Sequence, residues 1–155
     1  MATLAPCIWV PGQAEEAAGF YLAAFRAAGQ PAERRGEMRM GAEGALIAVT
    51  VALAGQEIIL FNPPGEERPS NGISLFLTCR TQAEVDALWD RLLEGGSPIC
   101  CGWLKDRYGV AWQVVPGAVA EMLRSADAAQ AARLMQAIQG MVKLDLPALQ
   151  RACEG

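Results

Sequence analysis

Histidine is absent from this chain of 155 residues, which narrows the chemistry that its side chains can perform. Catalytic triads that use histidine, histidine general bases and the usual histidine-bearing zinc sites are all excluded. The acids that could transfer protons are Glu57, within the strand-like run Gln56–Phe61, and Asp106, shortly before Gly109. An exposed strand edge and a charge-paired turn are the simpler interpretations of these two residues.

Five cysteines are the next candidates for chemistry. An odd count, one adjacent pair and no C-x-x-C spacing are not typical of a disulfide framework. Most lie in apolar, strand-like sequence, where cysteine behaves as a small hydrophobic residue. Cys101 could be a nucleophile, but it has no suitable base nearby and only Lys105 and Arg107 as neighbouring cations. We therefore expect reduced, structural thiols in a cytoplasmic protein. They are Cys7, Cys79, Cys100, Cys101 and Cys153.

The composition indicates a globular chain and disfavours two classes of partner. Hydrophobic residues make up 52% of the sequence and charged residues 19%, with a net charge of -4. A nucleic-acid-binding protein is more often basic. The longest apolar run, Ala45–Ala54, is about half of the ~18 residues that a membrane-spanning helix requires. No signal peptide is evident. We expect no nucleic-acid partner and no membrane partner.

The hydrophobic pattern of the first half predicts the element order strand, helix, strand, strand, strand. Pro11-Gly12 separates the first strand from the helix, whose alanines and aromatic residues recur at helical spacing. Ala54-Gly55 predicts a tight turn between the last two strands. The expected elements are a strand over Leu4–Val10, a helix over Gln13–Ala28, and strands over Glu33–Met40, Ala45–Leu53 and Gln56–Phe61.

The second half repeats this order. Thr81 is a candidate N-cap, with Glu84 as its capping-box partner, and Gly95-Gly96 ends the helix. A shared Gln-Ala-Glu at 13–15 and 82–84 supports a duplication. The expected strands are Ile73–Cys79, Ile99–Cys101, Trp103–Arg107 and Val110–Val115.

The breaker-rich stretch 63–71 predicts a linker between the two modules, which are residues 1–62 and 72–116. A helical tail, residues 117–155, follows, with Asp127 and Asp145 as N-caps. We expect one domain over residues 1–155. Its fold class is α+β: two tandem βαβββ modules that form a curved eight-stranded mixed sheet, with the C-terminal helical tail.

Two segments resemble a known family. The opening Pro6–Trp9 followed by Gln13–Tyr21, and the stretch Cys101–Gly109 followed by Trp112–Pro116, look like the PhnB-like branch of the vicinal-oxygen-chelate, or glyoxalase/bleomycin-resistance, superfamily. Some members of that branch are called demethylubiquinone methyltransferase-like. The resemblance covers most of the chain, the tail included. It implies the duplicated fold, and it implies a homodimer because members often dimerise.

The resemblance also implies four metal-ligand positions, two in each module, which in the superfamily's enzymes carry His, Gln or Glu. They fall at Pro6, at Ile59, near Gly72 and at Gln113. Gln113 alone could bind a metal, and a single amide does so weakly. We therefore expect no metal and no other cofactor.

The strand register that the resemblance implies places Gln113 in a concave, largely apolar pocket. Gln113 would be the main polar group that a ligand contacts in this pocket. Such a pocket suits a small apolar or aromatic ligand, and a pocket filled by its own side chains is the alternative. Trp9 and Trp112 are expected on the other side of the sheet, toward the helices. The other expected pocket residues are Ser74, Phe76, Ile59, Phe61, Ile8 and Trp103, with Val10 beside them.

The function that we expect is metal-independent binding of a small molecule. One alternative is a metal-free enzyme, of lyase or isomerase type, that uses Glu57 or Asp106. The other alternative is the methyltransferase activity that the name of the family branch suggests. The sequence argues against it, because it has no glycine-rich turn between a strand and a helix of a parallel sheet.

Overall fold

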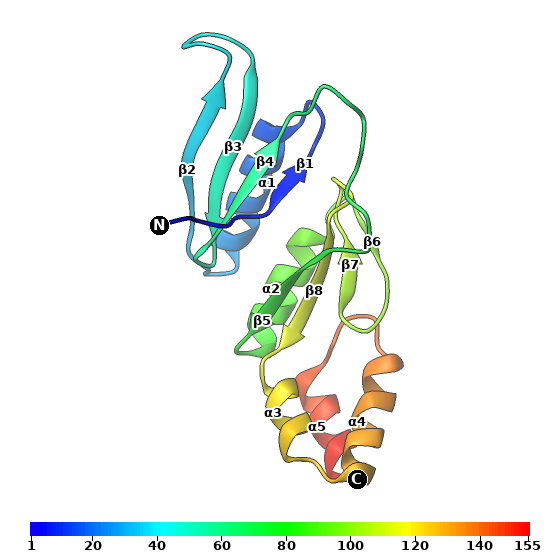
Figure 1. Cartoon of the computed structure of the whole chain (residues 1–155). Coiled ribbons are helices and arrows are strands. Elements are labelled where there is room, and N and C mark those ends of the chain that lie inside the picture. The colour runs from blue at the N-terminus through cyan, green and yellow to red at the C-terminus, as the bar shows by residue number, and fades with distance from the viewer. The chain divides into compact units, whose positions relative to one another are not determined.

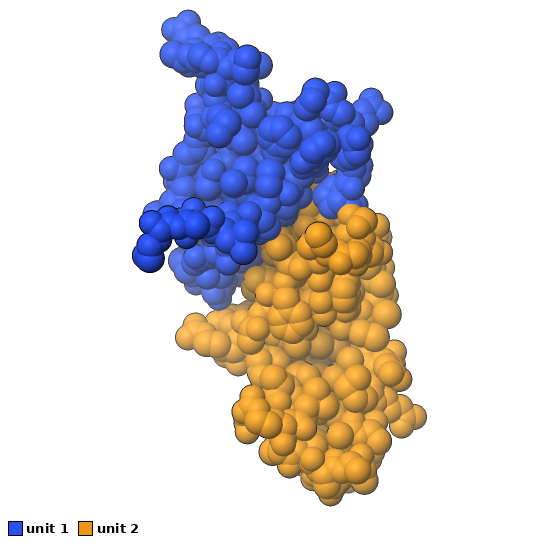
Figure 2. All heavy atoms as spheres, viewed as in Figure 1, with its two compact units in different colours: residues 1–69 blue, residues 70–155 orange.

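The computed structural model describes residues 1–155, which divide into two compact units. Unit 1 is Met1–Pro69 and unit 2 is Ser70–Gly155, coloured separately in Figure 2. The boundary between them lies in the stretch rich in proline and glycine. None of the chain's helices has both the length and the apolar character that spanning a bilayer requires.

Unit 1 consists of one helix and a four-stranded mixed sheet (Figure 1). The strand order is β1-β4-β3-β2, in which β1 runs parallel to β4 and the other pairs are antiparallel. The predicted turn at Ala54-Gly55 joins β3 to β4, and both of its residues have positive φ. The elements are β1 (Cys7–Trp9), α1 (Ala14–Ala27), β2 (Ala32–Arg39), β3 (Leu46–Leu53) and β4 (Gln56–Phe61).

Helix α1 packs on one face of this sheet through small and aromatic residues. Ala14, Ala17 and Ala18 are fully buried, and Tyr21 and Phe25 are almost so. Three alanines in the first turns allow the helix backbone to come close to the strands. The sheet side chains that face α1 are likewise buried: Val49, Val51, Ile58 and Leu60.

Unit 2 repeats this arrangement with shorter strands. Its sheet order is β5-β8-β7-β6, with β5 parallel to β8. The N-cap prediction is confirmed, because Thr81 accepts a hydrogen bond from the Glu84 backbone N–H at 3.2 Å. The Glu84 carboxylate accepts from the N–H of Arg80 instead of closing the box at Thr81. The elements are β5 (Ser74–Cys79), α2 (Gln82–Leu92), β6 (Ser97–Pro98), β7 (Trp103–Lys105) and β8 (Ala111–Pro116).

The tail of unit 2 forms three short helices: α3 (Ala118–Ser125), α4 (Ala128–Gln139) and α5 (Leu146–Glu154). Asp127 and Asp145 cap α4 and α5 as predicted, the first in a full capping box with Gln130. The helices enclose a small apolar core of their own: Val119, Leu134, Leu144 and Leu149.

The predicted fold class is confirmed: the protein is α+β, with two βαβββ modules and C-terminal helices. Its eight strands lie in two four-stranded sheets, each hydrogen-bonded within its own unit. One strand was misplaced. The second module's edge strand is Ser97–Pro98, whereas the predicted strand Ile99–Cys101 enters the turn before β7.

Candidate functional site

Three strands of unit 2 align Phe76, Gln113 and Trp103 in one row. Phe76 pairs with Gln113 between β5 and β8, and Trp103 pairs with Gln113 between β7 and β8. Residues that pair directly across strands project from the same side of a sheet. This side is opposite to α2, because Trp112 and Val114, the neighbours of Gln113 along β8, are buried. We call Ser74, Phe76, Gln113 and Trp103 the Gln113 face.

A side-chain hydrogen bond holds the amide of Gln113 in place. Its Nε2 donates to Oγ of Ser74 at 2.9 Å, between residues 39 positions apart. No protein group donates to Oε1 of Gln113. Gln113, Ser74 and Trp103 are half-buried, and Phe76 is 58% exposed. The face therefore combines one oriented amide with two accessible aromatic rings.

The tail closes one end of this face. Val115, two residues after Gln113 on β8 and on the same side of the sheet, packs against the apolar core of the tail. The opposite end carries Lys105, the register partner of Ala111. The accessible part of the face thus lies around Gln113 and Phe76.

Unit 1 has a corresponding apolar face. Trp9 pairs with Phe61 and Cys7 with Ile59 between the parallel strands β1 and β4, on the side of the sheet opposite to α1. The rings of Trp9 and Phe61 meet edge to face with centroids 5.8 Å apart, and Trp9 is 37% exposed. Ile59 and Phe61 thus lie on the side of the unit 1 sheet that is turned away from α1.

The predicted facing of the side chains along β1 was wrong, because the strand's alternation is shifted by one residue. Ile8 pairs with Leu60, which is fully buried toward α1, and Val10 is also fully buried. Ile8 and Val10 therefore point to the helix side, and Trp9 to the other side. All three residues are apolar, so the sequence offered no polar alternation to set the phase of this short strand.

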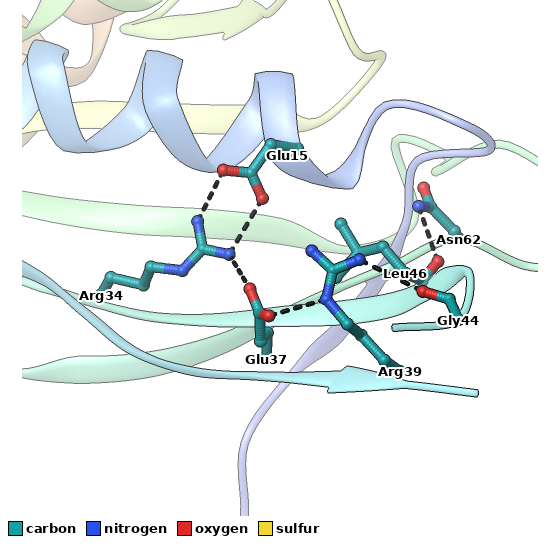
Figure 3. A network of polar contacts seen from close by, with 7 residues as sticks. All are labelled: Glu15, Arg34, Glu37, Arg39, Gly44, Leu46 and Asn62. Carbon is teal, nitrogen blue, oxygen red and sulfur yellow. Dashed lines mark hydrogen bonds and ion pairs between the residues drawn. The ribbon is translucent and has the colours of Figure 1, made fainter. Parts of the chain in front are cut away.

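A charged network of unit 1 lies on the α1 side of its sheet (Figure 3). Arg34 on β2 binds Glu15 on α1 through both terminal nitrogens, at 2.7 and 2.9 Å, and also binds Glu37. Glu37 accepts a further hydrogen bond from Arg39. Arg34 holds the pKa of Glu15 below its ordinary value. This network attaches the start of α1 to the edge strand, and sequence reasoning missed it.

The two acids considered for catalysis are both engaged elsewhere. Asp106 is 3% exposed and accepts hydrogen bonds from the backbone N–H groups of Tyr108 and Val110 and from the indole of Trp112. Such contacts hold a turn together. Glu57 lies on an exposed strand end, with its carboxylate 3.8 Å from Arg35.

Unit 1 also has a hollow of about 380 Å³ that contains none of the predicted site residues. It is lined by Pro31, Ala32, Glu33, Arg35, Ala52 and Gly55. Its two charged side chains, Glu33 and Arg35, bind each other at 2.7 Å, so neither is available to orient a ligand. The oriented amide of Gln113 is the stronger indication of a binding site.

The donor atoms at the four implied ligand positions do not fit a metal ion. Pro6, Ile59 and Gly72 offer no donor side chain, and Gln113 offers one neutral amide oxygen. Nowhere in the chain do three or more Cys, Asp or Glu side chains form a group that could hold a metal. Transition-metal sites in proteins usually need three or four such donors.

Comparison with known proteins supports this fold. A PhnB protein from Bacillus cereus superposes with a TM-score of 0.62 at 27% identity, over 72% of this chain and 97% of its own. A Pseudomonas aeruginosa protein gives 0.56 at 21% identity, over 72% and 95%. The fosfomycin resistance protein FosX from Listeria monocytogenes, solved with Mn(II) and sulfate, gives 0.55 at 13% identity, over 79% and 95%. No curated protein matches the chain.

A family model described as 3-demethylubiquinone-9 3-methyltransferase matches residues 2–115. The match ends within β8, so the expected resemblance of the tail is not supported. It includes both βαβββ modules and all four residues of the Gln113 face. The chain therefore belongs to the 3-demethylubiquinone-9 3-methyltransferase family, the PhnB-like branch of the glyoxalase superfamily.

Proposed function

We propose that this protein binds a small aromatic or apolar molecule without a metal, and that the Gln113 face of unit 2 is the binding surface. The observation that carries the proposal is the hydrogen bond between Gln113 and Ser74 in the middle of a row of aromatic side chains. Ligand sites are typically apolar surfaces with a few polar groups that fix orientation.

The Ser74 hydroxyl can either accept or donate a hydrogen bond, so the Gln113 amide can bind it in either of two orientations. When Nε2 donates to Ser74, Oε1 accepts from a ligand N–H or O–H. When the amide is turned, Ser74 donates to Oε1 and the NH₂ group donates to a ligand carbonyl. Phe76 and Trp103 flank the amide and can stack on an aromatic ring of the ligand.

The methyl transfer that the family description names requires a methyl donor, and the residues do not fit the common S-adenosylmethionine site. That site uses a glycine-rich turn between a strand and a helix of a parallel sheet. Here the turn from β1 to α1 has one glycine, Gly12, and the first helical N–H of α1 is bound by Asn62 at 3.0 Å. The turn from β5 to α2 has none.

Benzamide is a suitable probe, because it has one aromatic ring, one carbonyl and one NH₂ group. In ¹⁵N NMR titrations we expect it to shift the side-chain amide signals of Gln113 and the indole signal of Trp103. Substitution Gln113→Leu should weaken binding by roughly five- to tenfold, the value of one hydrogen bond. The matched control is Gln56→Leu, since Gln56 is exposed in unit 1 and its side chain donates a hydrogen bond to the carbonyl of Glu57.

Binding should survive dialysis against a chelator. Equal weakening in both glutamine variants, or loss of binding with the chelator, would contradict the proposal. A titration with S-adenosylmethionine under the same conditions tests the methyltransferase alternative, which saturable shifts would support. Native mass spectrometry of the same samples tests the expected homodimer and detects any retained organic molecule.

A further inference from the structure

The chain contains two asparagines, Asn62 and Asn71, and they differ in the residue that follows. Asparagine is a thermolabile residue, because the backbone nitrogen of the next residue can attack its side-chain carbonyl carbon. Asn71 is followed by Gly72, which has no side chain to hinder that attack. Asn62 is followed by Pro63, whose nitrogen has no proton to lose. The sequence therefore separates a reactive asparagine from an unreactive one.

The structure holds the amide of Asn62 in place from both sides (Figure 3). Its Oδ1 accepts a hydrogen bond from the N–H of Ala14 at 3.0 Å, and its Nδ2 donates to the carbonyl of Leu46 at 3.2 Å. The residue is half-buried, directly after the end of β4. Asn62 is thus an internal reference for an asparagine that should not react.

The turn that contains Asn71 is exposed and weakly held. Residues 70–73 are all exposed, and Ile73 is 80% exposed. The N–H of Gly72 donates to Oγ of Ser70 at 3.3 Å, and the N–H of Ile73 donates to the carbonyl of Ser70 at 3.4 Å. Both distances exceed the usual value of about 2.9–3.0 Å. The side chain of Asn71 makes no hydrogen bond to the protein.

The nitrogen of Gly72 lies outside the sheet of unit 2. Strand β5 begins at Ser74, so Gly72 takes no part in the ladder between β5 and β8. A Cβ atom on Gly72 would have one neighbour within 4 Å, Oγ of Ser70 at 3.4 Å, so the space around this residue is open. The side chain of Asn71 and the nitrogen of Gly72 can therefore approach each other without breaking a bond of any strand or helix.

We propose that Asn71 and Gly72 form a site of spontaneous deamidation, which places an isoaspartate between the two units. The nitrogen of Gly72 bonds to Cγ of Asn71, the bond from Cγ to the amide nitrogen breaks, and the proton of Gly72 leaves with that nitrogen as ammonia. Water then opens the cyclic succinimide, at the main-chain carbonyl to give isoaspartate or at the side-chain carbonyl to give aspartate. The sum is Asn + H₂O → isoAsp or Asp + NH₃, without oxidation or reduction.

The reaction changes the start of unit 2 in two ways. Isoaspartate continues the main chain through its side chain, so the backbone gains one CH₂ group just after the boundary between Pro69 and Ser70. The new carboxylate adds one negative charge to the net charge of -4, close to Glu66 and Glu67. An aged molecule therefore differs from a newly made one in the length and the charge of the segment that joins the units.

The test follows both asparagines in the full-length protein during incubation at neutral and at mildly alkaline pH. Cleavage after glutamate places them on separate peptides, residues 58–66 and residues 68–84. We expect the peptide 68–84 to exchange one NH₂ group for one OH group, with isoaspartate identified by fragmentation, and the peptide 58–66 to stay unchanged. Conversion should be faster at the higher pH, because the attacking nitrogen must lose its proton. Unincubated protein, digested in parallel, corrects for conversion during the digest.

Two variants isolate the site. Gly72→Ala fits the turn, because its nearest neighbour would be at 3.4 Å, and its methyl group hinders the attack. This variant should slow conversion by at least about tenfold, which corresponds to a barrier higher by about 1.4 kcal/mol. Asn71→Gln should abolish the more acidic form of the intact protein, as seen by ion-exchange chromatography.

A synthetic peptide of residues 68–84 sets the time scale of the experiment. Conversion of Asn71 in the protein by the time that half of this peptide has reacted supports the proposal. An unchanged Asn71 at that time, equal conversion of Asn62 and Asn71, or the same rate in Gly72→Ala as in the unsubstituted protein would overturn it.

Discussion

The carboxylate of Asp106 accepts a hydrogen bond from the indole Nε1 of Trp112 at 2.8 Å, within the turn that precedes β8. The other carboxylate oxygen accepts from the backbone N–H groups of Tyr108 and Val110. Asp106 is the one buried charged residue of the chain, and its hydrogen bonds compensate for its burial. This arrangement orients Trp112, whose neighbour along β8 is Gln113.

Substitution Asp106→Ala should destabilise the protein by about 3 kcal/mol, because it leaves buried N–H donors without their acceptor. Asp106→Asn should cost less, since the amide oxygen can still accept from the backbone. Urea unfolding followed by circular dichroism measures both. A loss below about 0.5 kcal/mol for Asp106→Ala, typical of surface substitutions, would contradict this role.

A double-mutant cycle isolates the contact between Asp106 and Trp112. We expect a coupling energy of about 1 kcal/mol or more between Asp106→Asn and Trp112→Phe, and close to zero between Asp106→Asn and Trp89→Phe. Trp89 is buried on α2 but makes no hydrogen bond to Asp106. Equal coupling in the two cycles would indicate general loosening of the core.

The tail is attached to α2 mainly by Gln82. Its Nε2 donates to the carbonyl of Leu144 at 3.0 Å, and its Oε1 accepts from the N–H of Leu146 at 2.7 Å. Gln82→Ala should therefore cost about 1–3 kcal/mol and speed hydrogen exchange in α4 and α5. Lys143→Ala removes a half-exposed ion pair with Asp86 and should cost at most about 1 kcal/mol. The reverse order of effects would argue against this attachment.

Local signals in the sequence predicted most elements and several of their ends. Thr81, Asp127 and Asp145 cap helices as expected, and Ala54-Gly55 forms the expected turn, because caps and turns depend on residues close in sequence. Trp112 is buried toward the helix side, as its alternation with Gln113 along β8 predicted.

Features that depend on pairing between segments distant in sequence could not be predicted from local signals. The orientation of Ile8 follows from the register of β1 on β4, which an all-apolar run does not specify. The ion pair of Arg34 with Glu15 and the bond from Gln113 to Ser74 join residues 19 and 39 positions apart. Nothing in the sequence indicated that the carbonyls of Met141 and Val142 would accept hydrogen bonds from the N–H groups of Cys101 and Gly102, in the turn before β7.

The network around Arg34 predicts a pH dependence (Figure 3). Arg34 lowers the pKa of Glu15, and Arg39 and Arg34 lower that of Glu37, from an ordinary value of 4.5. A lowered folded-state pKa contributes stability above the unfolded value and loses it as pH falls through the folded value. Stability should therefore decrease as pH falls below about 4.5.

Substitution Arg34→Lys removes the two-pronged contact and should raise the pKa of Glu15 and Glu37, as measured by NMR titration of their side-chain carboxyl carbons. The control Arg35→Lys changes a residue that binds Glu33 instead, and it should leave both values unchanged. Unaltered titration of Glu15 in Arg34→Lys would show that the network does not persist in solution.

The turn between β3 and β4 offers a stabilising substitution. Ala54 has a φ of 50° and is followed by Gly55 at 87°, the signs that a type I′ hairpin turn requires. Asparagine tolerates the left-handed region better than alanine, so Ala54→Asn should stabilise the protein by about 0.5–1 kcal/mol. Ala54→Val should destabilise it, because a β-branched side chain opposes positive φ. Thermal unfolding of the two variants and of the unsubstituted protein gives the order of their stabilities. Equal melting temperatures would contradict this turn geometry.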